Sequence, residues 1–170
     1  TVNPARLQHL RELGFNRLSF GVQDFDAAVQ QAVHREQSTE QVFELVQAAR
    51  QLQFDSINVD LIYGLPQQSQ ASFAQTLQTL VALRPDRVAL YAYAHLPTRF
   101  KPQRRIDSQQ LPSGAEKVAL QALALRTMSE AGYVDIGMDH FALPEDSLAV
   151  AKRKGLLHRN FQGYSTQADT

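Results

Sequence analysis

The sequence predicts an α/β fold built on a parallel sheet, open or curved into a barrel, with helices on its outer side. Segments with helical and with strand periodicity alternate along the first 97 residues. The strand segments are short, rich in β-branched residues and closed by turn residues. Strands joined through helices of this length need right-handed crossovers, which place them parallel in one sheet.

The first elements have clear start and stop signals. Asn3 can accept hydrogen bonds from free backbone amides, and Pro4 suits the first helical position, so a helix is predicted to begin there. Leucines at helical spacing follow, and Gly14 ends the helix. A strand over residues 16–22 and a short helix over residues 27–32 come next.

The later elements are predicted in the same way. Ser38 and Gln41 fit a capping box that starts a helix running to Leu52. The remaining elements are a strand and its turn over 57–66, a helix from Ser69 ended by Pro85, a strand over 88–93, a helix from Ser113 to Ala131, a strand over 133–137 and a helix over about 145–154.

Residues 57–66 are the stretch around which the fold is expected to be organised. Their apolar, mostly β-branched side chains suit a strand covered on both faces. Asp60 lies among them, and a carboxylate is costly to bury there unless it is paired or hydrogen-bonded. We expect Asp60 either to meet a ligand at the strand end, or to cap a backbone amide or pair with an Arg.

Polar residues close four predicted strands: Gln23, Asp60, residues 94–95 and residues 139–140. Because the carboxyl ends of parallel strands converge, these residues predict a barrel-type site on one face. Asp60 can accept hydrogen bonds from a hydroxyl pair or an ammonium group, Gln23 can donate and accept, and Arg35 can hold a carboxylate. Together they suit a ligand that carries amino-acid and ribose groups.

Two other site types fit the sequence less well. A metal site of His95, His140 and His158 with Asp139 lacks the tight ligand spacing of structural zinc sites. A serine hydrolase would need a strand-to-helix nucleophile turn around a Ser, which is missing. Residues 157–167 have no clean periodicity and form either part of a site or a surface loop.

Composition narrows the class of protein. The chain has 170 residues, 44% of them hydrophobic, which suffices for one core. Its 17 Lys and Arg residues balance 17 Asp and Glu, so no charge pattern indicates nucleic acid or an anionic membrane. No stretch has the length of a membrane span and no signal-peptide pattern begins at Thr1, so we expect a cytoplasmic protein. The absence of Cys excludes disulfides and thiolate ligands within the chain.

Three parts are predicted along the chain. Residues 1–97 form a partial barrel of strand–helix repeats. Residues 98–113 are basic and punctuated by proline, and form a loop excursion. Residues 114–170 form the last strand–helix unit and the start of a further C-terminal region.

Six segments together resemble the oxygen-independent coproporphyrinogen III oxidase family. They are residues 21–25 (GVQDF), 33–37 (VHREQ), 58–66 (NVDLIYGLP), 93–97 (YAHLP), 137–142 (GMDHFA) and 157–164 (LHRNFQGY), in the order found in that family. The family consists of radical S-adenosylmethionine enzymes of bacterial haem synthesis, which oxidatively decarboxylate coproporphyrinogen III to protoporphyrinogen IX. The resemblance covers nearly the whole chain and implies part of an open (β/α)6-type radical SAM barrel with parallel strands and outer helices.

The resemblance also implies roles for single residues. Gln23, Arg35 and Asp60 match positions that hold a second S-adenosylmethionine, and Ala94 matches one whose backbone contacts the first. Gln162 lies in a family motif near the site. His34 stands where the family usually has Asn, which puts the local hydrogen bonding there in question.

The chain lacks the Cys residues that bind the iron–sulfur cluster in this family. The family binds a four-iron four-sulfur (4Fe-4S) cluster through a Cys-rich loop upstream of these motifs, and this chain has no Cys. We therefore expect an internal piece of a longer enzyme, inactive by itself. The resemblance implies coproporphyrinogen III as substrate, an electron donor for the cluster and a monomeric state, without nucleic-acid or membrane partners. A haem chaperone of the same fold, which binds tetrapyrrole without oxidising it, and an unrelated sugar or amino-acid barrel enzyme are the alternatives.

Overall fold

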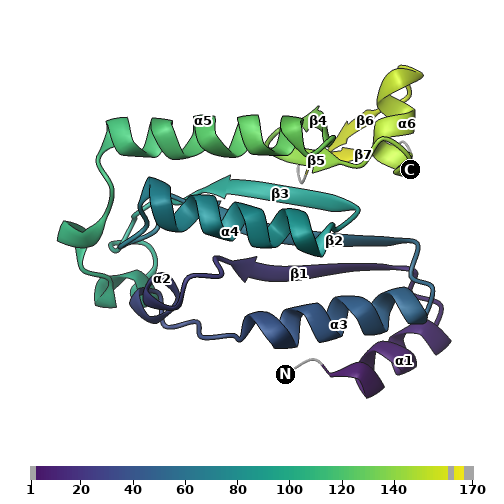
Figure 1. Ribbon diagram of the computed structural model, residues 1–170, viewed down its shortest axis with the longest axis horizontal. Helices are drawn as coiled ribbons and strands as arrows, with labels where there is room; N and C mark the ends of the chain where they lie inside the picture. The colour runs from purple at the N-terminus through teal and green to yellow at the C-terminus, as the bar shows by residue number, and fades with distance from the viewer. Residues whose placement is uncertain (1–2, 161–162, 167–170) are drawn as a thin grey trace.

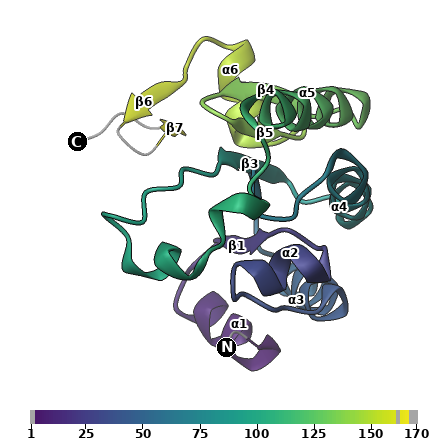
Figure 2. The same ribbon diagram turned by 90° about the vertical axis from the view of Figure 1, so that its left-hand side faces the viewer.

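The computed structural model describes residues 3–160 and 163–166. Within these residues the chain forms a five-stranded sheet, with the strand order β1-β2-β3-β5-β4, and a separate two-stranded hairpin, β6-β7 (Figure 1). Helices cover one face of the large sheet, and the other face is left more exposed (Figure 2).

Three parallel strands form one side of the sheet, as predicted. They are β1 (Arg17–Gln23), β2 (Ser56–Tyr63) and β3 (Arg87–Ala92). β1 pairs with β2 and β2 pairs with β3, both in parallel register. Each connection between them runs through helices, which confirms the crossover arrangement expected from the alternation of elements.

The helices begin close to where the sequence places them. They are α1 (Pro4–Glu12), α2 (Ala27–Ala32), α3 (Thr39–Gln51), α4 (Gln70–Leu83), α5 (Gly114–Glu130) and α6 (Ser147–Arg153). The predicted N-caps Asn3, Ser38, Ser69 and Ser113 each accept a hydrogen bond from a backbone amide three residues on. The predicted excursion over residues 98–113 contains two 3-10 turns, η1 (Lys101–Arg105) and η2 (Ser108–Gln110).

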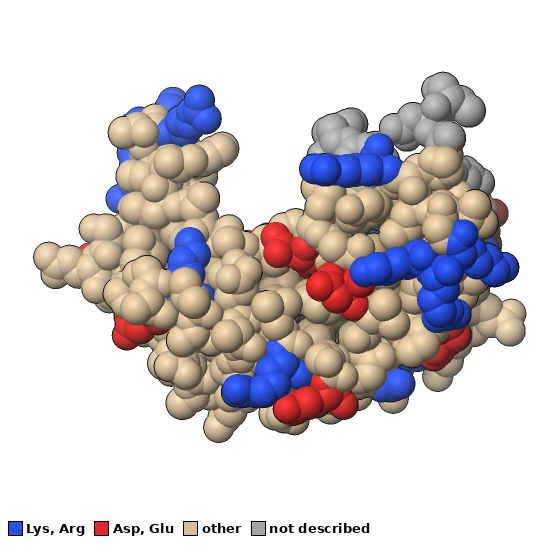
Figure 3. All heavy atoms as spheres, turned by 90° about the horizontal axis from the view of Figure 1, so that it is seen from above, with Lys and Arg blue, Asp and Glu red and all other residues tan. Residues whose placement is uncertain are grey.

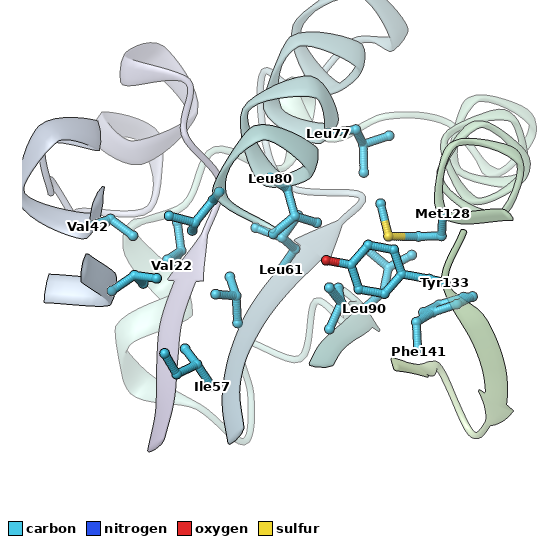
Figure 4. Close-up of a cluster of buried hydrophobic side chains, with 14 of the residues drawn as sticks. Val22, Val42, Ile57, Leu61, Leu77, Leu80, Leu90, Met128, Tyr133 and Phe141 are labelled. Atoms are coloured by element: carbon cyan, nitrogen blue, oxygen red, sulfur yellow. The ribbon is translucent and has the colours of Figure 1, made fainter. Parts of the chain in front are cut away.

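The hydrophobic core lies between the sheet and the helices. Alternate residues of β2, such as Ile57, Val59 and Leu61, point into it and are at most 1% exposed. They meet side chains of α3, α4 and α5, including those that Figure 4 labels: Val42, Leu77, Leu80 and Met128. Burial on this face holds the strands in register, since a shift by one residue would turn the apolar side chains outward.

The opposite face of the sheet carries the other residues of each strand and is more polar. In Figure 2 the helices α3, α4 and α5 lie on one side of the strands, while the segment with η1 and η2 and the β6-β7 hairpin extend from the other. Figure 3 shows that the surface is hollowed between two projections and that acidic side chains lie in the hollow. We call this side of the sheet the open face.

The sheet continues beyond β3 in a way that the sequence did not predict. The predicted fourth strand is β4 (Val134–Gly137), but β5 (His140–Ala142) lies between it and β3 and pairs antiparallel with both. Met138 and Asp139 connect β4 to β5 as a two-residue turn, with φ of 51° and 63°. These residues lack the Asn-Gly signature of such turns, so the sequence carries no local signal for the hairpin.

The last described segment also differs from the prediction. Residues expected to have no regular structure form β6 (His158–Asn160) and β7 (Gly163–Ser165), an antiparallel hairpin. Across the described ranges, no helix combines the length and apolar character that crossing a membrane requires.

Candidate ligand-binding site

Asp60 points to the open face, where it belongs to a small polar network. Its Oδ1 accepts from Nδ2 of Asn58 at 2.6 Å, and its Oδ2 accepts from the Ser19 hydroxyl at 3.3 Å. Asn58 Nδ2 also lies 2.9 Å from Ser19 Oγ. The carboxylate is therefore oriented by neutral groups and keeps acceptor capacity for a ligand.

The strand-end position expected for Asp60 is wrong in detail. Asp60 lies within β2, three residues before the strand ends at Tyr63. It avoids burial because alternate residues of a strand face opposite sides, and its own side is the open face. Of the options weighed from the sequence, pairing with an Arg is not seen among the described contacts, and the partners are Asn58 and Ser19.

Gln23 and Arg35 lie beside Asp60 in space. The register pairs Gly21 of β1 with Asp60 of β2. The Arg35 guanidinium donates from Nη2 to the Gly21 carbonyl at 2.9 Å. A Cβ added at Gly21 would lie 3.0 Å from Gln23 Nε2 and 3.2 Å from Arg35 Nη2, so both side chains pack over this glycine. The structure thus brings together Gln23 of β1, Asp60 of β2 and Arg35 of the segment after α2.

A cavity of about 680 Å³ adjoins this group on the side of β1. Its lining includes Ser19, Gly21 and Arg35, together with residues of α1 and α3. This volume falls within the usual range of small-molecule sites, about 300–1,000 Å³.

Ala94 lies just beyond the end of β3 and close to the end of β2. The amide of the preceding residue, Tyr93, donates to the Tyr63 carbonyl at 2.8 Å. The Ala94 carbonyl accepts from Gln103 Nε2 at 3.0 Å, and Gln103 Oε1 accepts from the Leu96 amide. Gln103 therefore holds the turn after β3 from within the 98–113 segment.

Lys117 of α5 supports the same turn. Its Nζ donates to the Tyr93 carbonyl. Its aliphatic chain crosses Gly64, the first residue after β2. Sequence patterns did not indicate Gln103 or Lys117, because neither lies in a motif, and Lys117 also acts 24 positions away from Tyr93.

Residues 139–140 do not close a parallel strand as expected, although His140 does reach the open face. His140 pairs with Ala89 of β3, which pairs with Asp60 of β2, so all three lie in one row across the sheet. His140 Nδ1 lies 2.6 Å from the Met138 carbonyl, which can only accept, so Nδ1 carries a proton and Nε2 is free to bond elsewhere when the ring is neutral.

Tyr91 lies next to this row. Its ring meets that of His140 edge-on, with the centroids 6.0 Å apart. Burial, and then the charges of Asp60 and Asp139, raise the pKa of Tyr91, so it remains a neutral phenol and a hydrogen-bond donor.

The other predicted residues are less informative. Gln162 falls outside the described residues. Where the structure describes the chain, it groups no three His, Asp or Glu side chains as ligands for a metal ion. His95 instead lies with Nδ1 3.0 Å from the Tyr93 hydroxyl.

Comparison with known proteins identifies the class of this fold. Residues 1–80 match the family model of the Radical SAM superfamily. The solved coproporphyrinogen III oxidase of Escherichia coli, described as a radical SAM enzyme, matches 99% of this chain with a TM-score of 0.96 and 53% identity. The chain therefore has the fold of a radical SAM enzyme.

Curated relatives indicate which radical SAM enzymes this chain is similar to in sequence. The oxygen-independent coproporphyrinogen III oxidase of Salmonella typhimurium is 55% identical over 96% of this chain. That of Pseudomonas aeruginosa is 57% identical over 92% of it. The chain spans 36% and 34% of the length of these two relatives, and 39% of the Escherichia coli structure. It is homologous to a segment of the oxygen-independent coproporphyrinogen III oxidases, which confirms the resemblance found in the sequence.

Proposed function

We propose that this chain forms the S-adenosylmethionine-binding part of an oxygen-independent coproporphyrinogen III oxidase that acts in haem biosynthesis. The observation that carries the proposal is that Gly21 pairs with Asp60 across β1 and β2, while the side chains of Gln23 and Arg35 pack over Gly21. The similarity to oxidases of that name extends over nearly the whole chain.

The residues present fit S-adenosylmethionine. Asp60 presents a carboxylate oriented by Asn58 and Ser19, which suits ribose hydroxyls or an ammonium group. Arg35 uses one N–H on the Gly21 carbonyl and keeps others for the ligand carboxylate. Gln23 can donate and accept alongside them. The Ala94 backbone is the expected contact of a first S-adenosylmethionine.

The residues of this chain do not provide ligands for the iron–sulfur cluster. It contains no Cys, so the thiolates for a 4Fe-4S cluster would come from a segment outside it. When bound, the cluster and S-adenosylmethionine supply the one-electron chemistry. The residues of this chain hold and orient the ligand and shield it from water on the sheet face.

The complete enzyme has a substrate and an electron donor as partners. Coproporphyrinogen III is the substrate, and its propionate side chains are the reacting groups. An electron donor serves the cluster, and the enzyme works as a monomer in the cytoplasm.

The test uses the complete enzyme, meaning this chain together with the segment that supplies the cluster ligands. Anaerobic reaction with coproporphyrinogen III should give protoporphyrinogen IX. Asp60→Asn keeps the side-chain shape and removes its charge, so it should lose about 1.5–3 kcal/mol of ligand binding, roughly ten- to a hundredfold in S-adenosylmethionine affinity. The iron–sulfur absorption should not change.

Asp55→Asn is the matched control. Asp55 accepts from Asn16 Nδ2 at 2.9 Å near the start of β2, away from the site, so the same chemical change there should leave affinity unaltered. Normal turnover by Asp60→Asn, or loss of the cluster, would show that Asp60 is structural. Enzyme that retains haem and makes no vinyl product would favour the chaperone instead.

A further inference from the structure

Asp24, the residue after β1, is an acid almost fully removed from water. It is 1% exposed, and burial raises the pKa of its carboxyl group. Oδ1 accepts from the Asp26 amide at 2.8 Å and from the Thr76 hydroxyl, while Oδ2 accepts from Gln68 Nε2 at 2.6 Å. In the part of the chain that the structure describes, no Lys or Arg forms an ion pair with it.

Gln68 connects Asp24 to the end of β2. Its Nε2 donates to Asp24 and also to the Ile62 carbonyl at 3.1 Å. Its Oε1 accepts from the amides of Gly64 at 2.6 Å and Leu65 at 3.3 Å. The carboxyl ends of β1 and β2 are therefore held together by side chains as well as by the sheet.

Gln30 of α2 connects Asp24 to the segment that carries Arg35. Gln30 is 6% exposed. Its Nε2 donates to the Asp24 carbonyl at 2.8 Å, and its Oε1 accepts from the Gln37 amide at 3.1 Å. The Arg35 amide donates to the Gln30 carbonyl at 2.9 Å. Both ends of the turn around Arg35 are thus attached to Gln30, one through its backbone carbonyl and the other through its buried side chain.

Gln23 lies in a backbone conformation that needs such support. Its φ is 72°, in the left-handed region, and the pairing register between β1 and β2 shifts between Gly21 and Gln23. A residue other than glycine is uncommon there, and such conformations persist where the surroundings impose them. The contacts of Asp24, the next residue, supply that constraint.

We propose that Asp24 and Gln30 are positioning residues, whose buried network sets Gln23 and Arg35 at the correct distance from Asp60 for binding a ligand with carboxylate and ribose groups. This inference rests on the proposed function, because the ligand is the S-adenosylmethionine assigned to the same site. Neither residue contacts the ligand. They act through the backbone of residues 23 and 35.

The central test is Asp24→Asn in the complete enzyme. Asparagine turns an N–H group toward either Gln68 Nε2 or the donors at Oδ1, so one hydrogen bond becomes a donor–donor contact. The variant should bind S-adenosylmethionine about tenfold more weakly, equivalent to the loss of one charge-assisted hydrogen bond at Arg35. Adding Gln68→Glu restores an acceptor opposite the new N–H but loses the donor to the Ile62 carbonyl, so it should recover only part of that affinity.

Asp146→Asn is the control for general loss of stability. Asp146 is also buried and accepts from Ser56 Oγ at 3.1 Å and Arg87 Nε at 3.0 Å, but at the amino ends of β2 and β3. Asp146→Asn should lower the melting temperature, as Asp24→Asn does, but should leave the affinity for S-adenosylmethionine at the wild-type value. Should Asp24→Asn fail to fold, Gln30→Met, which keeps the side-chain volume and removes both hydrogen bonds, takes its place.

Arg35→Gln tests the ligand site itself, separately from the buried network that supports it. If it weakens binding while both Asp24→Asn and Gln30→Met bind normally at reduced stability, the network is only structural and the inference is overturned. If Arg35→Gln itself binds S-adenosylmethionine normally, the proposed site is wrong. Weak binding by all three, with partial recovery in the Asp24→Asn, Gln68→Glu pair, supports the positioning role.

Discussion

Gly64, at the end of β2, offers a sharp test of how the site is supported. Its φ is 85°, and a Cβ added there would lie 2.7 Å from Lys117 Cε and 3.1 Å from Cδ. Gly64→Ala therefore has two effects. It places an alanine in a left-handed conformation, and it pushes Lys117 away from the Tyr93 carbonyl that its ammonium group caps.

The two effects have different magnitudes. The left-handed backbone costs about 1 kcal/mol for a residue with a Cβ. Loss of a hydrogen bond from a charged donor costs about 1.5 kcal/mol, the low end of its range, because water can reach the part-buried Tyr93 carbonyl. The free energy of unfolding should therefore fall by about 2.5 kcal/mol, and urea denaturation measures this directly.

Two comparisons isolate the contribution of Lys117. Gly14 has a φ of 91°, and a Cβ there would meet nothing within 4 Å, so Gly14→Ala should cost only the backbone part, about 1 kcal/mol. In a Lys117→Ala background, Gly64→Ala should also cost only about 1 kcal/mol. Equal costs for Gly64→Ala and Gly14→Ala in the otherwise wild-type chain would refute the packing argument.

Three further outcomes follow from the contacts. Gln103→Leu removes the hydrogen bonds to Ala94 and Leu96 and should loosen the turn after β3, seen as faster amide hydrogen exchange there, with exchange in β1 unchanged as the reference. The raised pKa of Asp24 means that its stabilising effect, relative to Asp24→Asn, is largest below the ordinary carboxyl pKa and is lost as pH rises through the raised value. Urea denaturation of both proteins from pH 4 to pH 7 checks this, and a difference that grows with pH would contradict it. Asp146→Asn should lower the free energy of unfolding by about 2 kcal/mol, because a hydrogen bond between two charged groups, Arg87 and Asp146, is weakened, and a cost below that of an exposed Asp55→Asn would refute this.

Local signals in the sequence determined the helices and the three parallel strands. Asn3, Ser38, Ser69 and Ser113 cap helices where they were expected to, because a cap bonds an amide only three residues away. The prediction that residues 57–66 form a strand covered on both faces is wrong, because alternate residues of β2 (Asn58, Asp60 and Ile62) lie on the open face and are only partly buried.

The sequence also predicted that Gln23 and Asp60 would lie on neighbouring parallel strands. Gln23 ends β1 and Asp60 lies within β2, and a parallel register then places them side by side. Arg35 was expected there through motif resemblance alone. Its bond to the Gly21 carbonyl depends on how α2 and the following turn fold back over β1.

Only the tertiary structure decided what holds these residues in place. Gln68 lies 44 positions from Asp24, and Gln103 and Lys117 reach the end of β3 from two later segments. The antiparallel insertion of β5 between β3 and β4 was likewise decided by packing, because its turn residues carry no local signature. Contacts of this kind form between elements that are distant in sequence, so their partners are chosen when the elements pack and not by any pattern within a single element.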